Sequence, residues 1–437
     1  MQLEITDRCN LRCSHCYHLE FDRVKKTADI PDELVMEMAR KLVEDRIFGV
    51  VVTGGEPLVR KELALRVIHY LKQNGVYVSL NTNLILLNQA SLASLVARGL
   101  DSMLVSCPSS DARLYSAMTG GGIYERFEYN LKMLIASGQR FAINMVVNKR
   151  NLADIRQTAE RMRDLGVRMF GVTPMALNLQ NPDSTRLLSQ EDVLTVIKEL
   201  IRIKEKLRME VDIFEALPKC IFPPYVRDAG YSFVSRCCQA GKTVASIANN
   251  GDIRPCSHNP KIYGNLLSEP LETIWEKMSE WRDTQTTPDR CLACGLVTNC
   301  FGGCRITAKA LTGHDKGEDP WMTTPTARPP EKPNSGIAPQ LTPDTVVTLS
   351  NPLRYRGEGK NTYLIASSRA NRNVTAINGP MFHFVIFLRN NSPISLARLA
   401  QLSGCHPGDR EFTRVISLLA SRGFISLDRE RKEDGYE

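Results

Sequence analysis

The sequence predicts an α/β protein: a partial (β/α)6 barrel, then a cysteine-rich extension and a small C-terminal α+β domain of winged-helix-like pattern. Two observations predict the barrel. Apolar strand-like runs alternate with amphipathic helical segments six times in the first 215 residues. Such alternation implies parallel strands joined by right-handed crossovers, and six units are fewer than the eight that close a full barrel.

Continuous apolar runs bounded by turn residues are typical of parallel strands buried on both faces. The strands are expected at residues 3–6, 48–53, 76–81, 103–106, 141–147 and 169–173. Helical periodicity with suitable start and stop residues places the intervening helices at 34–43, 61–74, 89–98, 124–137, 152–165 and 190–207.

Composition favours an ordinary globular protein of 437 residues, with 43% hydrophobic and 24% charged residues. No run of about 18 apolar residues and no signal peptide are recognisable, so neither a membrane span nor export is expected. Thirteen cysteines in an unexported chain indicate metal sites rather than disulfides, in a reducing cytoplasm. The net charge of +8 is compatible with an acidic peptide or a reductase as partner, or simply with a solvated surface.

The chemistry begins in a short loop after the first strand, where Cys9, Cys13 and Cys16 have C-x3-C-x2-C spacing. Three thiols cannot all form disulfides with one another. Three thiolates can hold three corners of an iron–sulfur cube and leave one iron open for another ligand. The alternative is a structural zinc site that takes its fourth ligand from His15 or His18.

This motif resembles the signature of the radical S-adenosylmethionine (SAM) superfamily, with His15 at a position that is usually aromatic. The resemblance implies a partial six-unit barrel and a 4Fe–4S cluster whose open iron binds the amino and carboxylate groups of SAM. In that family, an electron from the cluster cleaves SAM, and the resulting 5′-deoxyadenosyl radical takes a hydrogen atom from the substrate.

Active sites of such sheets lie at the C-terminal ends of the strands. There, Gly54, Gly55, Glu56 and Pro57 follow the second strand and resemble the family's GGE motif, whose backbone holds the SAM amino group. By the same resemblance, further strand ends offer SAM contacts at Asn83, Ser106 and Asn144 (or Asn148). The alternative for each polar residue is loop or helix capping.

Cys107 follows Ser106 in a segment where many relatives have an Asp-Gly pair, so local substrate contacts are expected to differ here. A thiol at a strand end is a candidate catalytic hydrogen-atom donor. A lone cysteine is more often a small buried hydrophobic residue, and that interpretation is preferred.

The second cysteine group has the order Cys238-x12-Gly251-x4-Cys256, then Cys291-x2-Cys294-x5-Cys300-x3-Cys304. It resembles the SPASM domain of peptide-modifying radical SAM enzymes, which holds two auxiliary iron–sulfur clusters. The resemblance implies a first auxiliary cluster on Cys238, Cys256 and Cys304, and a second on Cys291, Cys294 and Cys300.

The fourth ligands of both auxiliary clusters stay open. The family pattern places one more cysteine shortly after Cys304, but residues 313–322 contain none. For the second cluster the candidates are His314, Asp315, Asp319 or an open iron; for the first they are Cys237 and Cys220. The alternative is a zinc-ribbon-like site on the four cysteines 291, 294, 300 and 304.

Proline-rich residues 323–343 predict a linker, and residues 344–437 a compact module. Its expected strands are 346–349, 362–366 and 374–377, and its expected helices are 381–388, 395–402 and 411–421, with Gly423 as a C-terminal cap. The pattern resembles PqqD-like domains, which bind the leader of a precursor peptide as an added strand. The alternative is a nucleic-acid-binding winged helix using Arg410 and Arg414.

Four segments are therefore expected: a radical SAM barrel (1–215), a SPASM domain (216–322), a linker (323–343) and a leader-binding domain (344–437). The expected function is maturation of a ribosomally synthesised peptide, by an oxidative carbon–carbon or thioether crosslink. The expected cofactors and partners are three 4Fe–4S clusters, SAM, a precursor peptide and a flavodoxin- or ferredoxin-type reductant. Nucleic acid is not expected as a partner. The alternatives are oxidation of a small molecule or tetrapyrrole side chain, and a metal-dependent nucleic-acid-binding regulator.

Overall fold

The computed structural model describes residues 1–17, 29–177, 179, 183–282, 285–325, 341–349, 353–357, 362–367 and 374–429. It divides the chain into two compact units, Met1–Pro329 (unit 1) and Pro330–Glu437 (unit 2). The central part of the expected linker, residues 326–340, lies outside the described residues, as does His18. None of the described helices is long and apolar enough to cross a membrane.

Unit 1 is built on a ten-stranded sheet with the order β10-β9-β8-β1-β2-β3-β4-β5-β6-β7. The neighbouring strands from β1 to β7 are parallel, which confirms the expected α/β partial barrel. These strands are β1 (Gln2–Glu4), β2 (Gly49–Thr53), β3 (Tyr77–Thr82), β4 (Ser102–Ser106), β5 (Phe141–Val147), β6 (Met169–Pro174) and β7 (Glu210–Ile213). The seventh, β7, was not predicted.

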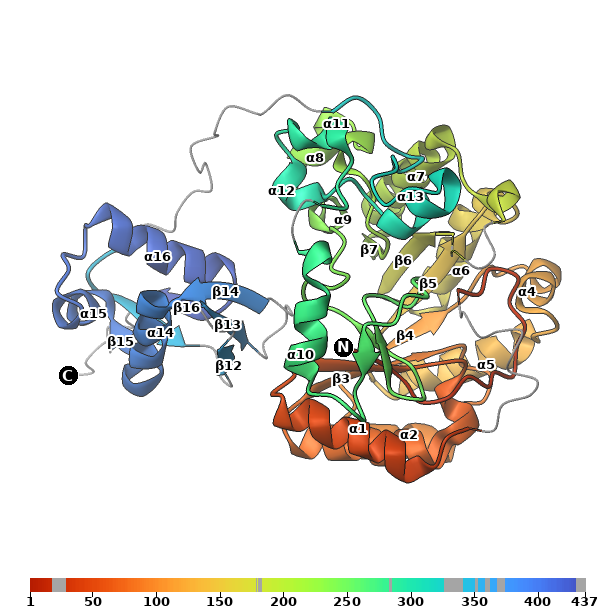
Figure 1. The fold of residues 1–437 in the computed structure, drawn as a ribbon, viewed down its shortest axis with the longest axis horizontal. Coiled ribbons are helices and arrows are strands. Elements are labelled where there is room, and N and C mark those ends of the chain that lie inside the picture. The colour runs from red at the N-terminus through yellow and green to blue at the C-terminus, as the bar shows by residue number, and fades with distance from the viewer. Residues whose placement is uncertain are drawn as a thin grey trace, which may run out of the picture. The chain divides into compact units, whose positions relative to one another are not determined.

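Helices cover the outer face of this sheet, as Figure 1 shows for the first two. They are α1 (Asp32–Glu44), α2 (Lys61–Gln73), α3 (Gln89–Ala97), α4 (Ala112–Thr119), α5 (Tyr124–Ala136), α6 (Ile155–Leu165) and α7 (Gln190–Leu207). Capping boxes at Asn88 and Ser189 fix the starts of α3 and α7. The unpredicted α4 begins where the Asp111 side chain accepts from Leu114 N and ends at Gly120, which has a positive φ.

The cysteine-rich region continues the barrel sheet instead of forming a separate core. Its strands are β8 (Ser246–Ile247), β9 (Asp252–Arg254) and β10 (Gly264–Asn265), and β8 pairs parallel with β1. Its helices are α8 (Pro224–Asp228), α9 (Ser232–Ser235), α10 (Leu271–Lys277), α11 (Asp289–Leu292), α12 (Val297–Cys300) and α13 (Arg305–Thr312). One hydrophobic core runs from Leu3 in β1 to Trp321. Barrel and extension are thus packed as one unit.

Unit 2 has its own core, which includes Leu399, Phe412 and Phe424. Two three-stranded antiparallel sheets have the orders β15-β11-β16 and β12-β13-β14. The elements are β11 (Thr345–Leu349), β12 (Leu353–Gly357), β13 (Thr362–Ser367), β14 (Val374–Asn378), α14 (Gly379–Asn391), β15 (Ile394–Ser395), α15 (Leu396–Leu402), α16 (Arg410–Ser421) and β16 (Ile425–Arg429). Gly423 follows α16 with a φ of 71°, as a C-terminal cap requires.

Candidate active site and metal centres

The cluster loop, residues 9–16, follows β1 and is fixed to the end of α4 by its backbone. Arg12 N donates to Thr119 O at 2.9 Å, and Ser14 N donates to Met118 O at 2.8 Å. A Cβ at Gly120 would lie 2.5 Å from Arg12 O, so only glycine allows this approach. The loop is therefore held by main-chain contacts that leave its cysteine side chains available.

The three loop thiols face a common space and differ in exposure. Cys9 and Cys13 are half-buried and Cys16 is exposed. Burial raises the pKa of Cys9 to about 11 and that of Cys13 further, and the sulfurs of Cys9 and Cys16 add to the increase at Cys13. Burial therefore disfavours the thiolate forms of Cys9 and Cys13 in the absence of a bound cation. Leu11 N donates to Cys9 Sγ at 3.4 Å, a contact that favours the thiolate.

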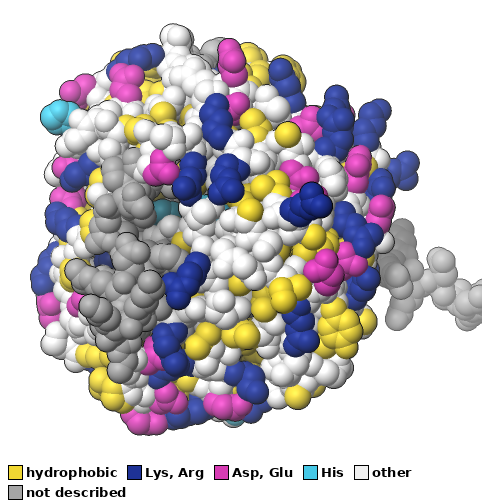
Figure 2. Space-filling model, turned by 90° about the vertical axis from the view of Figure 1, so that its right-hand side faces the viewer, with side chains coloured by type: hydrophobic (Ala, Val, Ile, Leu, Met, Phe, Trp, Pro, Cys, Tyr) yellow, Lys and Arg dark blue, Asp and Glu magenta, His cyan; other side chains and the backbone are white. Residues whose placement is uncertain are grey.

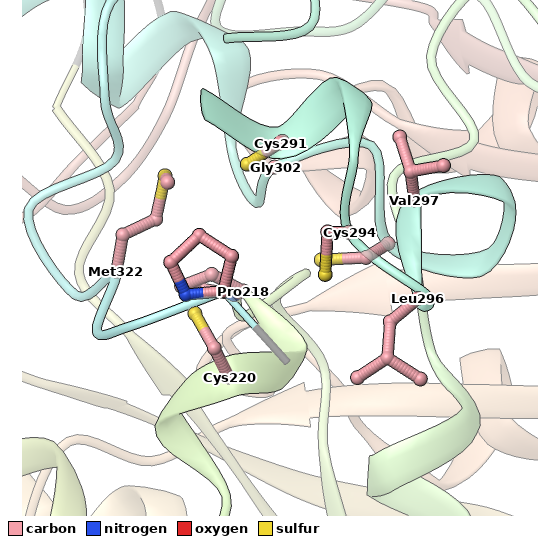
Figure 3. Close-up of a pocket in the computed structure, with 10 residues that line it drawn as sticks. Pro218, Cys220, Cys291, Cys294, Leu296, Val297, Gly302 and Met322 are labelled. Atoms are coloured by element: carbon pink, nitrogen blue, oxygen red, sulfur yellow. The ribbon is translucent and has the colours of Figure 1, made fainter. Parts of the chain in front are cut away.

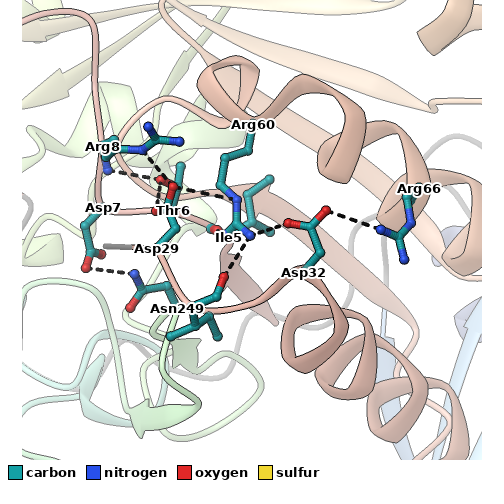
Figure 4. Close-up of polar contacts among 10 residues, drawn as sticks. Ile5, Thr6, Asp7, Arg8, Asp29, Asp32, Arg60, Arg66 and Asn249 are labelled. Atoms are coloured by element: carbon teal, nitrogen blue, oxygen red, sulfur yellow. Dashed lines mark hydrogen bonds and ion pairs between the residues drawn. The ribbon is translucent and has the colours of Figure 1, made fainter. Parts of the chain in front are cut away.

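A buried arginine, Arg60, supports the segment that leads into the cluster loop (Figure 4). Its guanidinium donates to Ile5 O at 2.8 Å and to Asp32 Oδ1 at 2.5 Å. Asp29 accepts from the neighbouring Arg8 guanidinium at 2.7 Å. The side chain of Arg60 is only 8% exposed, whereas that of Asp32 is 43% exposed, so this contact is partly buried and joins the end of β1 to the start of α1.

The Gly-Gly-Glu segment at the end of β2 packs directly on the start of the loop. Gly55 N donates to Thr6 O at 2.7 Å, and Glu56 N donates to Arg8 O at 2.8 Å. A Cβ at Gly54 would lie 2.3 Å from Thr6 O, and a Cβ at Gly55 would lie 2.2 Å from Arg8 O. The glycines are thus needed for contact between two backbones, in addition to the SAM contact predicted for this segment and Pro57.

The Glu56 carboxylate is buried and fully engaged with the protein. It accepts from Thr82 Oγ1 at 2.9 Å, from Asn83 N at 2.7 Å and from Leu58 N at 3.1 Å. Burial raises its pKa to about 7. Asn83 in turn places its Nδ2 3.8 Å from Cys9 Sγ. Glu56 therefore holds Asn83, and Asn83 in turn contacts Cys9 of the cluster loop.

Half-buried polar side chains of the three neighbouring strands β4, β5 and β6 lie close together. Ser106 is paired in register with Asn144, whose Oδ1 accepts from Thr173 Oγ1 at 2.8 Å. Asn148 instead accepts from Arg150 N at 2.9 Å and has the capping role given as its alternative. Of the two asparagines, Asn144 is the one placed beside Ser106, as a SAM-ribose contact would need.

Two other predicted site residues, Cys107 and His15, do not belong to this group of polar side chains. The Cys107 thiol is fully buried and donates to Ser109 O at 3.3 Å, which favours the preferred interpretation as a buried hydrophobic residue. The Nδ1 atom of His15 is buried and has no hydrogen-bond partner among the described residues. Burial lowers the pKa of His15 to about 4, so its imidazole is neutral at physiological pH.

The first cysteine site contains Cys238, Cys256 and Cys304, as predicted, and also a carboxylate that the sequence did not reveal. Glu215 follows β7 and raises the pKa of all three thiols, after burial itself. Burial also raises the pKa of Glu215, whose carboxylate contacts the Cys304 thiol. The site thus offers three sulfurs and one oxygen donor.

The second cysteine site is a pocket whose lining includes Cys220, Cys291, Cys294 and Cys300 (Figure 3). Cys220 was predicted as a candidate ligand of the first site; it lines the second because the turn Lys219–Ile221 packs against Cys300. Cys304 does not line this pocket. The zinc-ribbon arrangement on residues 291–304 therefore has no support in the structure.

The oxygen and nitrogen donors predicted for the second site have other positions. Asp319 accepts from Cys304 N at 2.8 Å and from Trp321 N at 2.9 Å. Asp315 is exposed and pairs with Lys309 at 2.7 Å, and His314 is also exposed. None of the three lines the pocket.

The donor set of the cysteine sites is the one that iron–sulfur clusters use. Zinc holds its sulfurs at about 2.3 Å from one centre, which brings them close together. Among the described residues, no three Cys, His, Asp or Glu side chains are arranged to hold a single metal ion. Groups of cysteine thiolates are the usual ligands of iron–sulfur clusters.

The face of unit 1 seen in Figure 2 gives no sign of nucleic-acid binding. On the face of unit 1 in Figure 2, basic and acidic side chains are interspersed. In unit 2, Arg410 and Arg414 are both exposed on α16, as a nucleic-acid contact would need. They share that helix with Glu411, also exposed.

Comparison with known proteins adds independent evidence. A model of the Radical SAM superfamily matches residues 3–162, and a model of the SPASM iron–sulfur cluster-binding domain matches residues 237–295. The AdoMet-dependent heme synthase of Methanosarcina barkeri is 26% identical over 338 residues, covering 73% of this chain and 94% of that protein. The PqqA peptide cyclase of Ruegeria pomeroyi is 27% identical over 336 residues, covering 73% and 86%.

Solved structures share the fold. SuiB of Streptococcus suis bound to its precursor peptide SuiA has a TM-score of 0.58 and 18% identity, covering 75% of this chain and 74% of that one. The enzyme anSMEcpe with bound AdoMet and the Kp18Cys peptide has a TM-score of 0.59 and 17% identity, covering 74% and 93%. With the cysteine loop at the barrel edge and the two cysteine sites behind it, the chain is a radical SAM enzyme with a SPASM domain, related to peptide cyclases.

Proposed function

We propose that this enzyme modifies a ribosomally synthesised precursor peptide by an oxidative crosslink, and that unit 2 binds the leader of that peptide. The observation that carries the proposal is the β12-β13-β14 sheet of unit 2. Among the described strands, none pairs with the outer edge of β12 or β14. An edge of this kind can accept an extended peptide through main-chain hydrogen bonds.

Unit 1 offers a matching catalytic face. When bound, SAM and its iron–sulfur cluster supply the hydrogen-abstracting radical. Asn83 and Glu56 orient the loop that carries Cys9, while Ser106 and Asn144 present polar groups at the same edge of the barrel. These residues bind and position; in this proposal they transfer no proton.

A tetrapyrrole side chain is the second candidate substrate. It is favoured by the likeness to the M. barkeri heme synthase, of which 94% is covered. That likeness involves 73% of this chain, the same share as the likeness to the PqqA peptide cyclase, so coverage does not separate the two candidates. We prefer the peptide because the β12-β13-β14 sheet of unit 2 has edges that can bind an extended leader.

The test uses the full chain, reconstituted anaerobically, with SAM, a strong reductant and, as candidate substrates, any short peptides found to be encoded beside its gene. We expect 5′-deoxyadenosine together with peptide that has lost two hydrogens, and inhibition by the leader segment alone. Modification of a haem precursor without modification of any peptide would favour the second candidate. Gel shifts of DNA without SAM cleavage would point to a nucleic-acid regulator.

A further inference from the structure

The second cysteine site has one more thiol than the sequence pattern gave it. Three of its cysteines come from the cysteine-rich region at family spacing, and the fourth, Cys220, lies at the junction between β7 and that region. We propose that Cys220 is the fourth ligand of the second auxiliary cluster, in place of the cysteine that is missing after Cys304. This inference rests on the proposed auxiliary clusters.

Backbone contacts lock Cys220 into the site. Lys219 N, one residue before it, donates to Cys300 Sγ at 3.1 Å. Thr323 N donates to Cys220 Sγ at 3.2 Å, and Thr323 Oγ1 donates to Cys220 O at 2.7 Å. N–H groups directed at sulfur stabilise thiolates and tune the clusters they ligate. A cysteine that served only for packing would not need such donors.

The rest of the pocket supports cluster binding. Its other lining residues are apolar or glycine: Pro218, Leu296, Val297, Gly302, Met322 and Pro325. Among the described residues no charged side chain lines it, so four thiolates there would need iron to balance their charge. Figure 3 shows Cys220 reaching the pocket from one segment of the chain and Cys291 and Cys294 reaching it from another.

Met322 is the competing donor, because it lines the same pocket within the segment where the family pattern places a cysteine. Its thioether is neutral and weakly accepting, whereas a thiolate is the usual ligand of iron–sulfur clusters. Cys220 is therefore the better ligand. With four thiolates the second site has no position left for substrate. The first site, with three sulfurs and Glu215, keeps a non-cysteine corner.

The test measures thiol protection and iron, not turnover. Reconstituted full-length protein and chelator-treated protein are alkylated with iodoacetamide, and modification is quantified by mass spectrometry. Cys220 should be at least tenfold less reactive in the loaded protein, as should Cys291. Iron, sulfide, zinc and Mössbauer spectra are then compared for Cys220→Ala, Cys291→Ala, Met322→Leu and a control, Cys405→Ala. Cys405 is an exposed cysteine of unit 2 that is no candidate ligand of any cluster.

We expect Cys220→Ala to lose the same iron signal as Cys291→Ala, and Met322→Leu and Cys405→Ala to retain it. If Cys220→Ala keeps full iron while Cys291→Ala does not, the ligand assignment is overturned and the cluster stands. If Cys291→Ala also keeps full iron, or if the site holds zinc, the second auxiliary cluster itself is refuted. The alkylation result needs no variant: a Cys220 that reacts equally in loaded and chelator-treated protein, while Cys291 is protected, overturns the ligand assignment even if Cys220→Ala does not fold.

Discussion

The buried ion pair between Glu4 and Arg254 gives a quantitative prediction about how the barrel and its extension are joined. Arg254 in β9 donates to Glu4 in β1 at 2.6 Å, and the two side chains are 8% and 2% exposed. Removing one partner of a buried pair leaves a charge without compensation and costs about 3–5 kcal/mol. We therefore expect Arg254→Met to lower the free energy of unfolding by that amount.

Urea unfolding of the reconstituted protein under anaerobic conditions measures this change. All three tryptophans of the chain, Trp275, Trp281 and Trp321, lie in the extension, so their fluorescence reports its unfolding. Glu4→Gln alone should also lower the free energy of unfolding. In the double variant this loss should be smaller, by at least about 2 kcal/mol, than the sum of the losses in the two single variants.

The matched control is Arg161→Met, which removes an exposed partner of Glu128. It should change little, because exposed pairs contribute little to stability. Equal urea midpoints for wild type, Arg254→Met and Arg161→Met would refute the idea that this pair holds the extension to the barrel.

Three further predictions concern the cysteine sites and their supports. Gly55→Ala should abolish SAM cleavage and iron in the cluster loop, because its Cβ would lie 2.2 Å from Arg8 O. Gly49→Ala at the start of β2, where nothing lies nearer than 3.5 Å to the added Cβ, should retain both. Burial raises the pKa of Glu56 to about 7, so its stabilising contribution is complete below the ordinary pKa of 4.5 and is lost as pH rises to 7. Between pH 4.5 and pH 7, the free energy of unfolding of the wild type, measured in urea, should fall by about 3 kcal/mol more than that of Glu56→Gln. Parallel plots of this free energy against pH for the two proteins would contradict the prediction. Glu215→Gln should alter the EPR spectrum of the first auxiliary cluster and leave that of the SAM-binding cluster unchanged; identical spectra would remove Glu215 from the site.

Local sequence patterns predicted the features that local physics determines. Buried apolar runs gave the six barrel strands, and the spacing of Cys9, Cys13 and Cys16 indicated the cluster loop. The strand β7 was missed because only four residues form it and two of them, Glu210 and Asp212, are acidic. Helix α4 was missed although Asp111 and Gly120 are recognisable start and stop signals.

Features that depend on distant segments meeting could not be predicted in this way. Nothing near Glu215 or Cys220 indicates which cysteines they approach, because the contact partners lie about 20 to 90 residues further along the chain. The pairing of β8 with β1 is equally non-local. The one available signal for Cys220 was the missing cysteine after Cys304. It indicated that the second cluster needs another ligand but did not identify the residue.

The most direct test of the account asks whether the cluster loop cleaves SAM. Reconstituted wild-type protein and a Cys13→Ala variant are mixed with SAM and dithionite, and 5′-deoxyadenosine is quantified by liquid chromatography. We predict 5′-deoxyadenosine from the wild type and none above background from Cys13→Ala. Equal amounts from both proteins, or none from a wild type that holds its full iron, would contradict the assignment of this loop as the SAM-cleaving centre.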